Sequence, residues 1–390
     1  MRAYAALLHY GAARRLLAAS VAGKLGFAIF PLATVLLGHG SSGSFLDAGA
    51  VAGAWSMGGT MTGPLRGRLV DRYGQRGPLA ALTFITALAV TGLASAAGTA
   101  QLICFGALAG AAAPPIVASI RPLWTQAVPK ELVHSAYALD AVLTEVTKIC
   151  GPLIAAAAAA HSPRMGVITA GVLLATGTCL VMSHPRADRA PAATGTGRGI
   201  LASPALRLLL TANVCAGLCL GALTVGLPAR AAEVGSAADA GWLFACLALG
   251  SALAGARFGA RPGAGNPAKG YLTAFVWLAL ALAPLAAVSA PSLLVILLIT
   301  AGAALAPMTI CLFGLLDAHA PRQAAVASMM WLVAGEELGI AAGTLMAGAL
   351  AQQTGAWLAL LTAAAGGGLG ALVIAIRKAD LAPRSKAPAV

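Results

Sequence analysis

Charged residues are scarce in this chain. Only 9% of its 390 residues are Asp, Glu, Lys or Arg, whereas 59% are hydrophobic. A soluble globular chain carries about 25% charged residues, so this chain lacks the polar side chains to cover a surface exposed to water. Lipid must therefore be the solvent for much of the molecule, and the composition excludes an ordinary soluble protein.

Motifs for chemistry are also few. The chain has no phosphate-binding loop of the Walker type, which argues against ATP as a direct energy source. The seven cysteines all lie in apolar runs without metal-ligand spacing, so we expect small buried residues. Aromatic residues make up 5% and provide no stacking cage that would identify a substrate. We therefore expect a protein that is not an enzyme and that needs neither cofactor nor metal.

Long uncharged windows predict the membrane spans, because a spanning helix needs about 20 apolar residues. Turn signals such as Ala97-Gly98-Thr99 and Ser289-Ala290-Pro291 divide the longest windows. Twelve crossings result, and only the segment near 135–160 carries charges within its run. The windows lie between Lys24 and Asp47, Asp47 and Arg66, Arg76 and Arg121, Arg164 and Arg186, Arg207 and Arg230, Asp239 and Arg257, Lys269 and Asp317, and Glu337 and Arg377.

The basic residues predict the orientation. If the N-terminus is cytoplasmic, the outside loops contain only Arg164 and Arg230, and Lys24 and Lys148 lie within spans. The inner segments then hold the remaining 21 of the 25 lysines and arginines. Because these residues form short clusters between apolar runs, the net charge of +13 fits the cytoplasmic rim of a membrane protein and not a nucleic-acid partner. We expect a multi-pass protein of the cell membrane with both termini in the cytoplasm.

A polar stretch and an internal repeat divide the chain into halves. Residues 184–203 are rich in Pro, Gly and Thr and predict a cytoplasmic linker between spans six and seven. Asp47 recurs as Asp239 and Glu145 as Glu337, and both pairs are 192 residues apart. We expect six-helix bundles at 1–183 and 204–390, related by an axis along the membrane normal. The fold class is all-α, with twelve transmembrane helices in two pseudo-symmetric bundles.

The loop after the second span carries the most specific motif, GRLVDRYGQRGPL, which begins at Gly67. It resembles the signature of the major facilitator superfamily, Gly-x-Leu-x-Asp-Arg-x-Gly-Arg-Arg/Lys, and departs from it at Gln75. With the twelve spans, the linker and the repeat, the resemblance covers essentially the whole chain. It implies that the Asp contacts the start of helix eleven and that the arginines tie neighbouring helices. The cytoplasmic gate residues would be Gly67, Asp71, Arg72, Gly74 and Arg76.

A second resemblance concerns Gly151-Pro152 in the fifth span. It is similar to the Gly-x-x-x-Gly-Pro-x-x-Gly-Gly element of exporters in this superfamily, although only the Gly-Pro core matches. The element implies a helix bend where the halves meet, and an ordinary kinked helix is the alternative. The Arg that such exporters carry in helix four is missing. Arg121, Trp124 and the stretch from Ala136 to Pro152 resemble an actinobacterial branch of the superfamily.

Charges at membrane depth are the candidate functional residues, because an intramembrane charge is costly and usually faces a protein cavity. Lys24, Lys148 and Arg121 are candidates for the polarity of the cavity, and Glu145, Glu336 and Glu337 for proton coupling. Glu145 and Lys148 are three residues apart, so a self-satisfied pair is the alternative there. Partial desolvation at this depth favours a carboxyl group that loads and releases a proton near neutral pH.

The sequence therefore predicts a secondary transporter that works by alternating access. The favoured function is proton-coupled export of a small organic or drug-like compound by a monomer, with protons, a small-molecule substrate and the lipid bilayer as partners. A nutrient importer of the same fold is one alternative. A membrane protein that binds or senses a ligand without transporting it is the other.

Overall fold

The computed structural model describes residue 7 and residues 9–184, 203–259, 266–288, 290–319 and 325–381, and every element in these ranges is helical. The first half of the chain forms α2 (Gly11–Ser42), α3 (Phe45–Tyr73), α4 (Arg76–Ser95), α5 (Thr99–Ala112), α6 (Ile116–Ala127), α7 (Lys130–His161) and α8 (Pro163–Met182). The second half forms α9 (Pro204–Val234), α10 (Ala240–Gly259), α11 (Pro267–Leu282), α12 (Pro291–Gly302), α13 (Leu305–His319), α14 (Ala325–Thr354) and α15 (Ala356–Ile376). Short 3-10 helices η2 (Ala237–Asp239), η3 (Ala283–Ala286) and η5 (Lys378–Leu381) complete the order. The predicted linker falls almost wholly outside the described residues.

Twelve crossings account for these helices. Within the described residues, nine helical segments are long and apolar enough to span a bilayer. The other three crossings are α3, whose run carries charges, α7, in which only the part from Val146 is apolar, and α5 followed by α6. Pro114 and Pro115 divide α5 from α6, because proline cannot donate the backbone hydrogen bond that continues a helix. The twelve-helix prediction is confirmed at the level of the fold.

The internal repeat is visible as repeated contacts. A Cβ on Gly58 would meet the Ala107 carbonyl at 2.2 Å, and one on Gly250 would meet the Ile299 carbonyl at 1.9 Å. Both members of the second contact lie 192 residues after those of the first, since 250 − 58 = 192 and 299 − 107 = 192. Ser44 and Ser236, again 192 apart, both cap the start of a helix. The halves therefore repeat each other in packing as well as in sequence.

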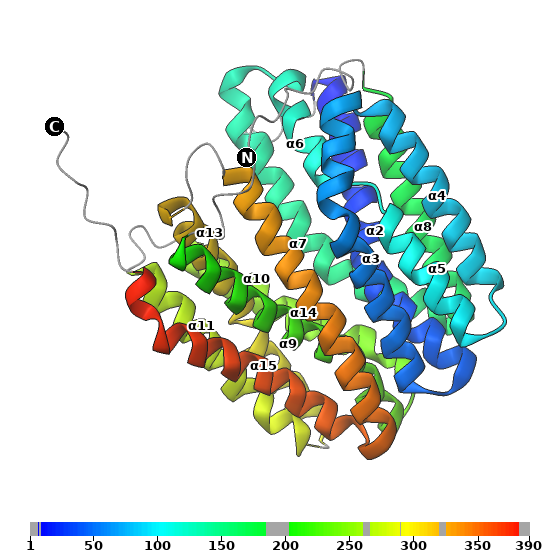
Figure 1. Ribbon diagram of the computed structural model, residues 1–390, viewed down its shortest axis with the longest axis vertical. Helices are drawn as coiled ribbons and strands as arrows, with labels where there is room; N and C mark the ends of the chain where they lie inside the picture. Colours follow the sequence, from blue (N-terminus) through cyan, green and yellow to red (C-terminus); the bar gives the residue numbers. More distant parts are fainter. Residues whose placement is uncertain are drawn as a thin grey trace.

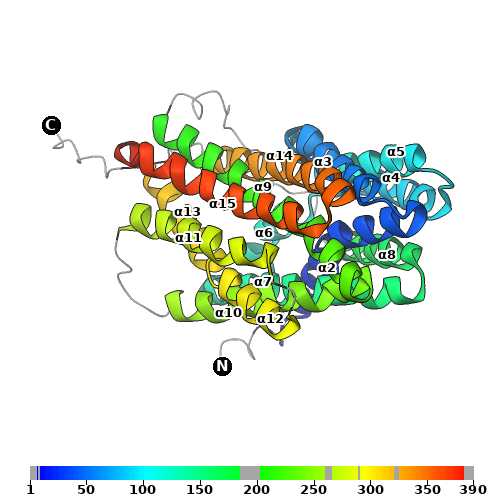
Figure 2. The same cartoon turned by 90° about the horizontal axis from the view of Figure 1, so that it is seen from below.

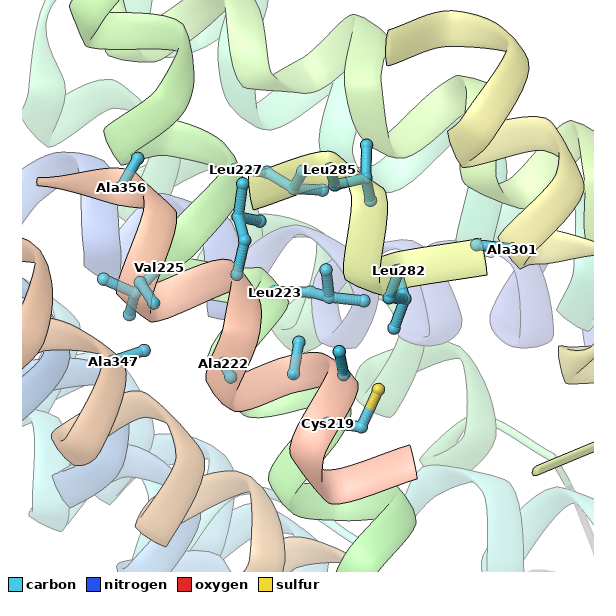
Figure 3. Packing of buried hydrophobic residues seen from close by; sticks show 14 of the residues in the cluster. Cys219, Ala222, Leu223, Val225, Leu227, Leu282, Leu285, Ala301, Ala347 and Ala356 are labelled. Carbon is cyan, nitrogen blue, oxygen red and sulfur yellow. The ribbon is translucent and has the colours of Figure 1, made fainter. Parts of the chain in front are cut away.

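The bundle has two ends that differ in how the halves meet. We call the end where α2 ends and α3 begins the far end, and the end that carries Tyr73 and His184 the linker end. Two apolar clusters contain residues of both halves. One joins Val35 and Ala48 to Leu223, and the other joins Ile29 and Val51 to Ala240. Figure 3 shows part of the first, with Leu223, Leu227 and Leu285 packed together.

At the linker end, the buried clusters of the described residues do not cross between halves. One contains residues from Leu7 to Val181 only, and the other contains residues from Ala205 to Leu381 only. Direct backbone contacts between the halves lie toward the far end, where Gly49 of α3 packs on Thr344 and Gly348 of α14. Figure 1 shows α3 and α14 converging toward that end. The halves are therefore joined at the far end of the bundle.

α14 packs closely against α9 through glycines of both helices. Gly217 and Gly221 of α9 lie against the carbonyls of Glu336 and Ile340, and Gly339 and Gly343 of α14 lie against the carbonyls of Val214 and Leu218. Both pairs have the Gly-x-x-x-Gly spacing that lets helices in a membrane approach closely. Figure 2 shows α14 lying beside α9 and α3. These contacts fix the depth and rotation of α14 relative to α9, and the contact of Gly49 with Thr344 positions it against the first half.

The far-end contact gives a first prediction. A Cβ at Gly49 would lie 2.3 Å from the Thr344 carbonyl oxygen, which is too close for a non-bonded contact between two heavy atoms. We expect Gly49→Ala to destabilise the purified protein by about 1–3 kcal/mol, the usual cost of overpacking, measured by thermal unfolding in detergent.

The matched control is Gly368→Ala in α15, where a Cβ would meet nothing within 4 Å. There the same change should be neutral or slightly stabilising, because alanine is the better helix former. Equal melting temperatures for the two variants would contradict the close approach of α3 and α14.

Candidate functional site

Adjacent carboxyl groups on α14 mark the candidate site. Glu336 and Glu337 lie near the middle of the helix, and both residues are only partly exposed. Successive residues on a helix point about 100° apart, so the two side chains meet different neighbours. Glu336 faces α9 of its own half, and Glu337 faces α3 of the other half.

Glu337 meets a hydroxyl and a guanidinium from the first half. The buried Ser56 on α3 lies close to its carboxyl group, and the charge of Arg66 acts on it. Arg66 itself donates from Nη2 to the Gly59 carbonyl at 2.8 Å and from Nη1 to the Ala113 carbonyl. The guanidinium therefore lies at the break between α5 and α6, where a carbonyl lacks its helical partner.

Glu336 lies beside a polar pair of the second half. Its carboxyl group lies close to the side chain of Asn213 on α9, whose Nδ2 donates to the Leu332 carbonyl at 2.7 Å. The fully buried Tyr271 of α11 is close enough for its hydroxyl to interact electrostatically with Glu336. That hydroxyl has no hydrogen-bond partner among the described residues. A cavity of about 60 Å³ between α9, α13 and α14 borders Glu336 and Asn213.

A buried ion pair lies in the first half. Lys24 Nζ of α2 is 2.8 Å from Asp140 Oδ1 of α7 and also donates to the Asp140 carbonyl at 2.8 Å. The Ser20 hydroxyl donates to the same carboxylate. Lys24 is only 6% exposed, so its ammonium is held by protein groups rather than by water.

Lys148 of α7 links the two regions. Its charge acts on Lys24 in its own half and on Glu336 in the other. The structure thus brings together Lys24, Lys148, Glu336 and Glu337 in one electrostatic network. The side chains of Glu145 and Arg121, which we also expected near the site, lie outside the described residues.

The residues of the predicted cytoplasmic gate contact several different elements. Gly74 has φ 78°, a conformation that glycine adopts without strain. Arg76 donates to the carbonyls of Met182 and His184 at the end of α8, and Arg72 lies over the Tyr73 ring. A Cβ on Gly67 would meet nothing within 4 Å. The Asp71 side chain lies outside the described residues.

The Gly-Pro element of α7 lies between helices of both halves. A Cβ on Gly151 would be 2.5 Å from the Ala28 Cβ of α2, and one on Gly241 of α10 would be 3.0 Å from the Pro152 carbonyl. Glycine at both positions therefore allows α7 to contact its own half and the other half at the same level.

Sequence reasoning missed four polar residues of this network: Ser56, Arg66, Asp140 and Asn213. Asp140 could have been found, because it is a carboxylate within the fifth span and Lys24 needs a partner at that depth. The charge pattern assigns Arg66 to the cytoplasmic segment after the second span, whereas α3 continues past it to Tyr73. Ser56 and Asn213 are uncharged, so a search for charged residues within the spans does not find them. Within the described ranges, no cluster of His, Cys, Asp and Glu side chains could hold a metal ion.

Comparisons with known proteins agree with this fold. The sequence profile described as Major Facilitator Superfamily matches residues 16–333. No curated protein resembles the sequence closely enough to be matched.

Several solved structures share the fold. A mutant of the nucleoside transporter NupG has a TM-score of 0.75 at 14% identity, covering 93% of this chain and 99% of that chain. A bacterial homologue of the human lysosomal transporter Spinster, inward-facing and occupied, has a TM-score of 0.74 at 15% identity, covering 96% and 98%. An auto-inhibited peptide transporter of the POT family has a TM-score of 0.71 at 13% identity, covering 96% and 97%.

The ion pair of Lys24 and Asp140 gives a second prediction. Asp140→Asn leaves a buried ammonium without its counter-charge, and we expect a loss of about 3–5 kcal/mol of stability. Replacing both residues, Lys24→Met with Asp140→Leu, removes the charge together with its partner and should cost much less. Thermal unfolding of the purified variants in detergent measures both effects.

The surface pair of Arg377 and Asp380, 2.9 Å apart, is the control. Asp380→Asn should cost less than about 1 kcal/mol, as exposed pairs do. If Asp140→Asn is no more harmful than Asp380→Asn, the buried pair does not stabilise the fold.

Proposed function

The chain belongs to the major facilitator superfamily, and we propose that it is a secondary active transporter that exports a small organic or drug-like compound in exchange for protons. The observation that carries the proposal is the position of the two acids on α14. Glu337 interacts with Arg66 and Glu336 with Lys148, and both cations belong to the other half. Loading either acid with a proton or a ligand would weaken an attraction between the halves, which is what an alternating-access carrier needs.

The packing of the halves supports alternating access. The apolar clusters that cross between halves include Val35 and Ala48 with Leu223, toward the far end. If the linker end faces the cytoplasm, as the basic residues predict, the halves pack together toward the outside, and no apolar cluster of the described residues crosses between them toward the inside. We take the bundles as 1–183 and 204–390 with the linker at 184–203. The Spinster homologue with a similar fold is described as inward-facing.

The gate at the linker end belongs to this proposal. Arg76 already joins the start of α4 to the end of α8 through the carbonyls of Met182 and His184. We assign Asp71 the role of closing this end against the start of α14, where the helix dipole favours a carboxylate. Gly74 permits the reversal between α3 and α4 on which the loop depends.

Two other functions are distinguished by direct measurements. An importer of the same fold would move its solute inward under the same gradient. A ligand-binding or sensing protein would bind its ligand saturably without accumulating it. We further propose a monomer in the cell membrane, with no nucleic-acid partner.

The coupling role of α14 gives a third prediction. In proteoliposomes with an imposed pH gradient and the drug-like dye ethidium as the first probe, the wild type should move dye against its gradient. Glu336→Gln or Glu337→Gln should reduce this movement at least tenfold, and the double variant should abolish it, because an amide neither binds nor releases a proton in this range.

Asp380→Asn is the matched control, since it removes a carboxylate outside the membrane core and should keep full transport. If both glutamate variants and the double variant keep gradient-driven transport, the proton is carried elsewhere. Saturable binding without transport by the wild type would favour the sensing function.

Orientation gives a fourth prediction. In a background without the native cysteines, Thr194→Cys in the linker should be protected in intact cells from an impermeant thiol reagent. Ala97→Cys, in the turn between α4 and α5 at the far end, should react. The reverse pattern would place the linker outside and invert the proposed orientation.

A further inference from the structure

The cavity beside Glu336 is the starting point. Its volume is about 60 Å³, and it lies between α9, α13 and α14 of the second half. The polar groups on its wall are Glu336, Asn213 and Thr309, and much of the rest is apolar, including Met308, Leu312 and Leu332. Such a lining fits a ligand with one charged end and a short hydrocarbon chain.

The internal repeat shows what occupies the equivalent place in the first half. Asn213 donates to the Leu332 carbonyl, and Lys24 donates to the Asp140 carbonyl. These two acceptors are equivalent, since 332 − 140 = 192. In both halves, therefore, a polar side chain of the first helix binds the same carbonyl of the fifth.

Lys24 has an uncharged counterpart in the second half. The residue 192 positions later is Ala216, which lines the cavity. In the first half, the alkyl chain and ammonium of Lys24 fill this space and reach Asp140 Oδ1 at 2.8 Å. In the second half, alanine ends at Cβ, and the cavity lies beside it. By the 192-residue offset, the cavity therefore lies beside the position that is equivalent to Lys24.

The carboxylate is retained one turn away. The counterpart of Asp140 is Leu332, and Glu336 follows Leu332 by four residues on the same helix. Residues four apart lie on one helical face, so the negative group remains on the same side of the cavity. The described cations of the second half lie at or near helix ends: Arg207, Arg230, Arg257, Lys269, Arg377 and Lys378. The second half thus keeps the carboxylate without supplying a lysine for it.

We propose that this cavity binds the primary-amine end of the transported compound, with the ammonium on Glu336 and Asn213 and its alkyl carbons against Met308, Leu312 and Leu332. The ligand takes the place that the Lys24 side chain takes in the first half. This inference rests on the proposed function, because it names the substrate class of the same site. Charge-assisted hydrogen bonds to the carboxylate provide the affinity.

Glu336 and Glu337 have different neighbours, which indicates different roles for the two acids. The groups that act on Glu336 are Asn213 and the Lys148 cation from α7, and Glu336 borders the cavity. Glu337 instead meets Ser56 and Arg66 of α3 and is not among the residues that line the cavity. Glu336 therefore holds the amine, and Glu337 is left to couple to the movement of the halves.

The cavity also limits what can enter it. Its volume of about 60 Å³ is far below the ~300–1,000 Å³ of pockets that enclose a drug-sized ligand, so it suits a small ammonium group and not a whole drug-sized molecule. A larger compound would place only its amine end here. A carboxylate on the wall disfavours an anionic group, and a mostly apolar lining offers too few oxygens for a bare metal ion.

The test uses the purified full-length protein in detergent and three probes that each contain three carbon atoms: propylammonium, 1-propanol and propionate. A ligand that binds the folded state raises the melting temperature. Propylammonium should raise it in a saturable way, whereas the neutral and anionic probes should not. Glu336→Gln should weaken propylammonium binding at least tenfold, consistent with loss of a charge-assisted bond. Asp380→Asn should bind like the wild type.

Ala216→Lys is the second variant, because it restores the residue of the first half. It should melt at or above the wild-type temperature and lose the response to propylammonium, since its own ammonium fills the cavity. Ala216→Val, which adds two methyl groups, should weaken binding without adding charge. Equal responses to all three probes, or full binding by Glu336→Gln, would overturn the inference.

These measurements do not depend on transport. Amine binding that disappears in Glu336→Gln, together with no gradient-driven transport, would keep the site and reject the proposed transporter. Gradient-driven transport without amine binding would keep the transporter and reject this substrate class.

Discussion

The close approach of α14 to α9 and α3 is the constraint on which the site depends. Glycines at Gly-x-x-x-Gly spacing bring backbone carbonyls within van der Waals contact of the neighbouring helix, because no Cβ intervenes. In lipid, such packing replaces the hydrophobic force that drives helices together in water. It also fixes the rotation of α14, so that Glu336 faces α9 while Glu337 faces α3. A change of register would exchange these neighbours and separate each acid from its cation.

The cost of charge in a membrane explains the rest of the network. An ionised group far from water persists only if other groups pair with it or bind it. Lys24 satisfies this condition within one half, through Asp140 and its carbonyl. Glu336 and Glu337 instead interact electrostatically across the halves, with the charges of Lys148 and Arg66 respectively. The ion pair of Lys24 and Asp140 joins two helices of one half, whereas the interactions across the halves depend on the charge that Glu336 and Glu337 carry.

The fold followed from the sequence because membrane insertion imposes simple rules. Uncharged windows and the 192-residue offset both extend over long stretches, so local errors do not alter the number of predicted spans. The site was harder to predict, because position along the chain gives depth but not direction. Glu337 was identified as a carboxylate at mid-membrane, yet its contact with Ser56 and Arg66 depends on helix rotation. Asn213 has no charge, and only the packing of α9 on α14 reveals that it binds the Leu332 carbonyl.

The 192-residue offset allows the two halves to be compared at equivalent positions. Both keep a polar bond from the first helix to the same carbonyl of the fifth, at Asp140 and at Leu332. The first half completes that contact with a lysine and its aspartate, which fills the bundle interior and holds α2 to α7. The second half has alanine at the lysine position and a glutamate one turn further along. Because an ionised carboxylate at this depth requires a compensating cation, the charge of Glu336 must be compensated by the facing half, where Lys148 acts on it, or by a ligand.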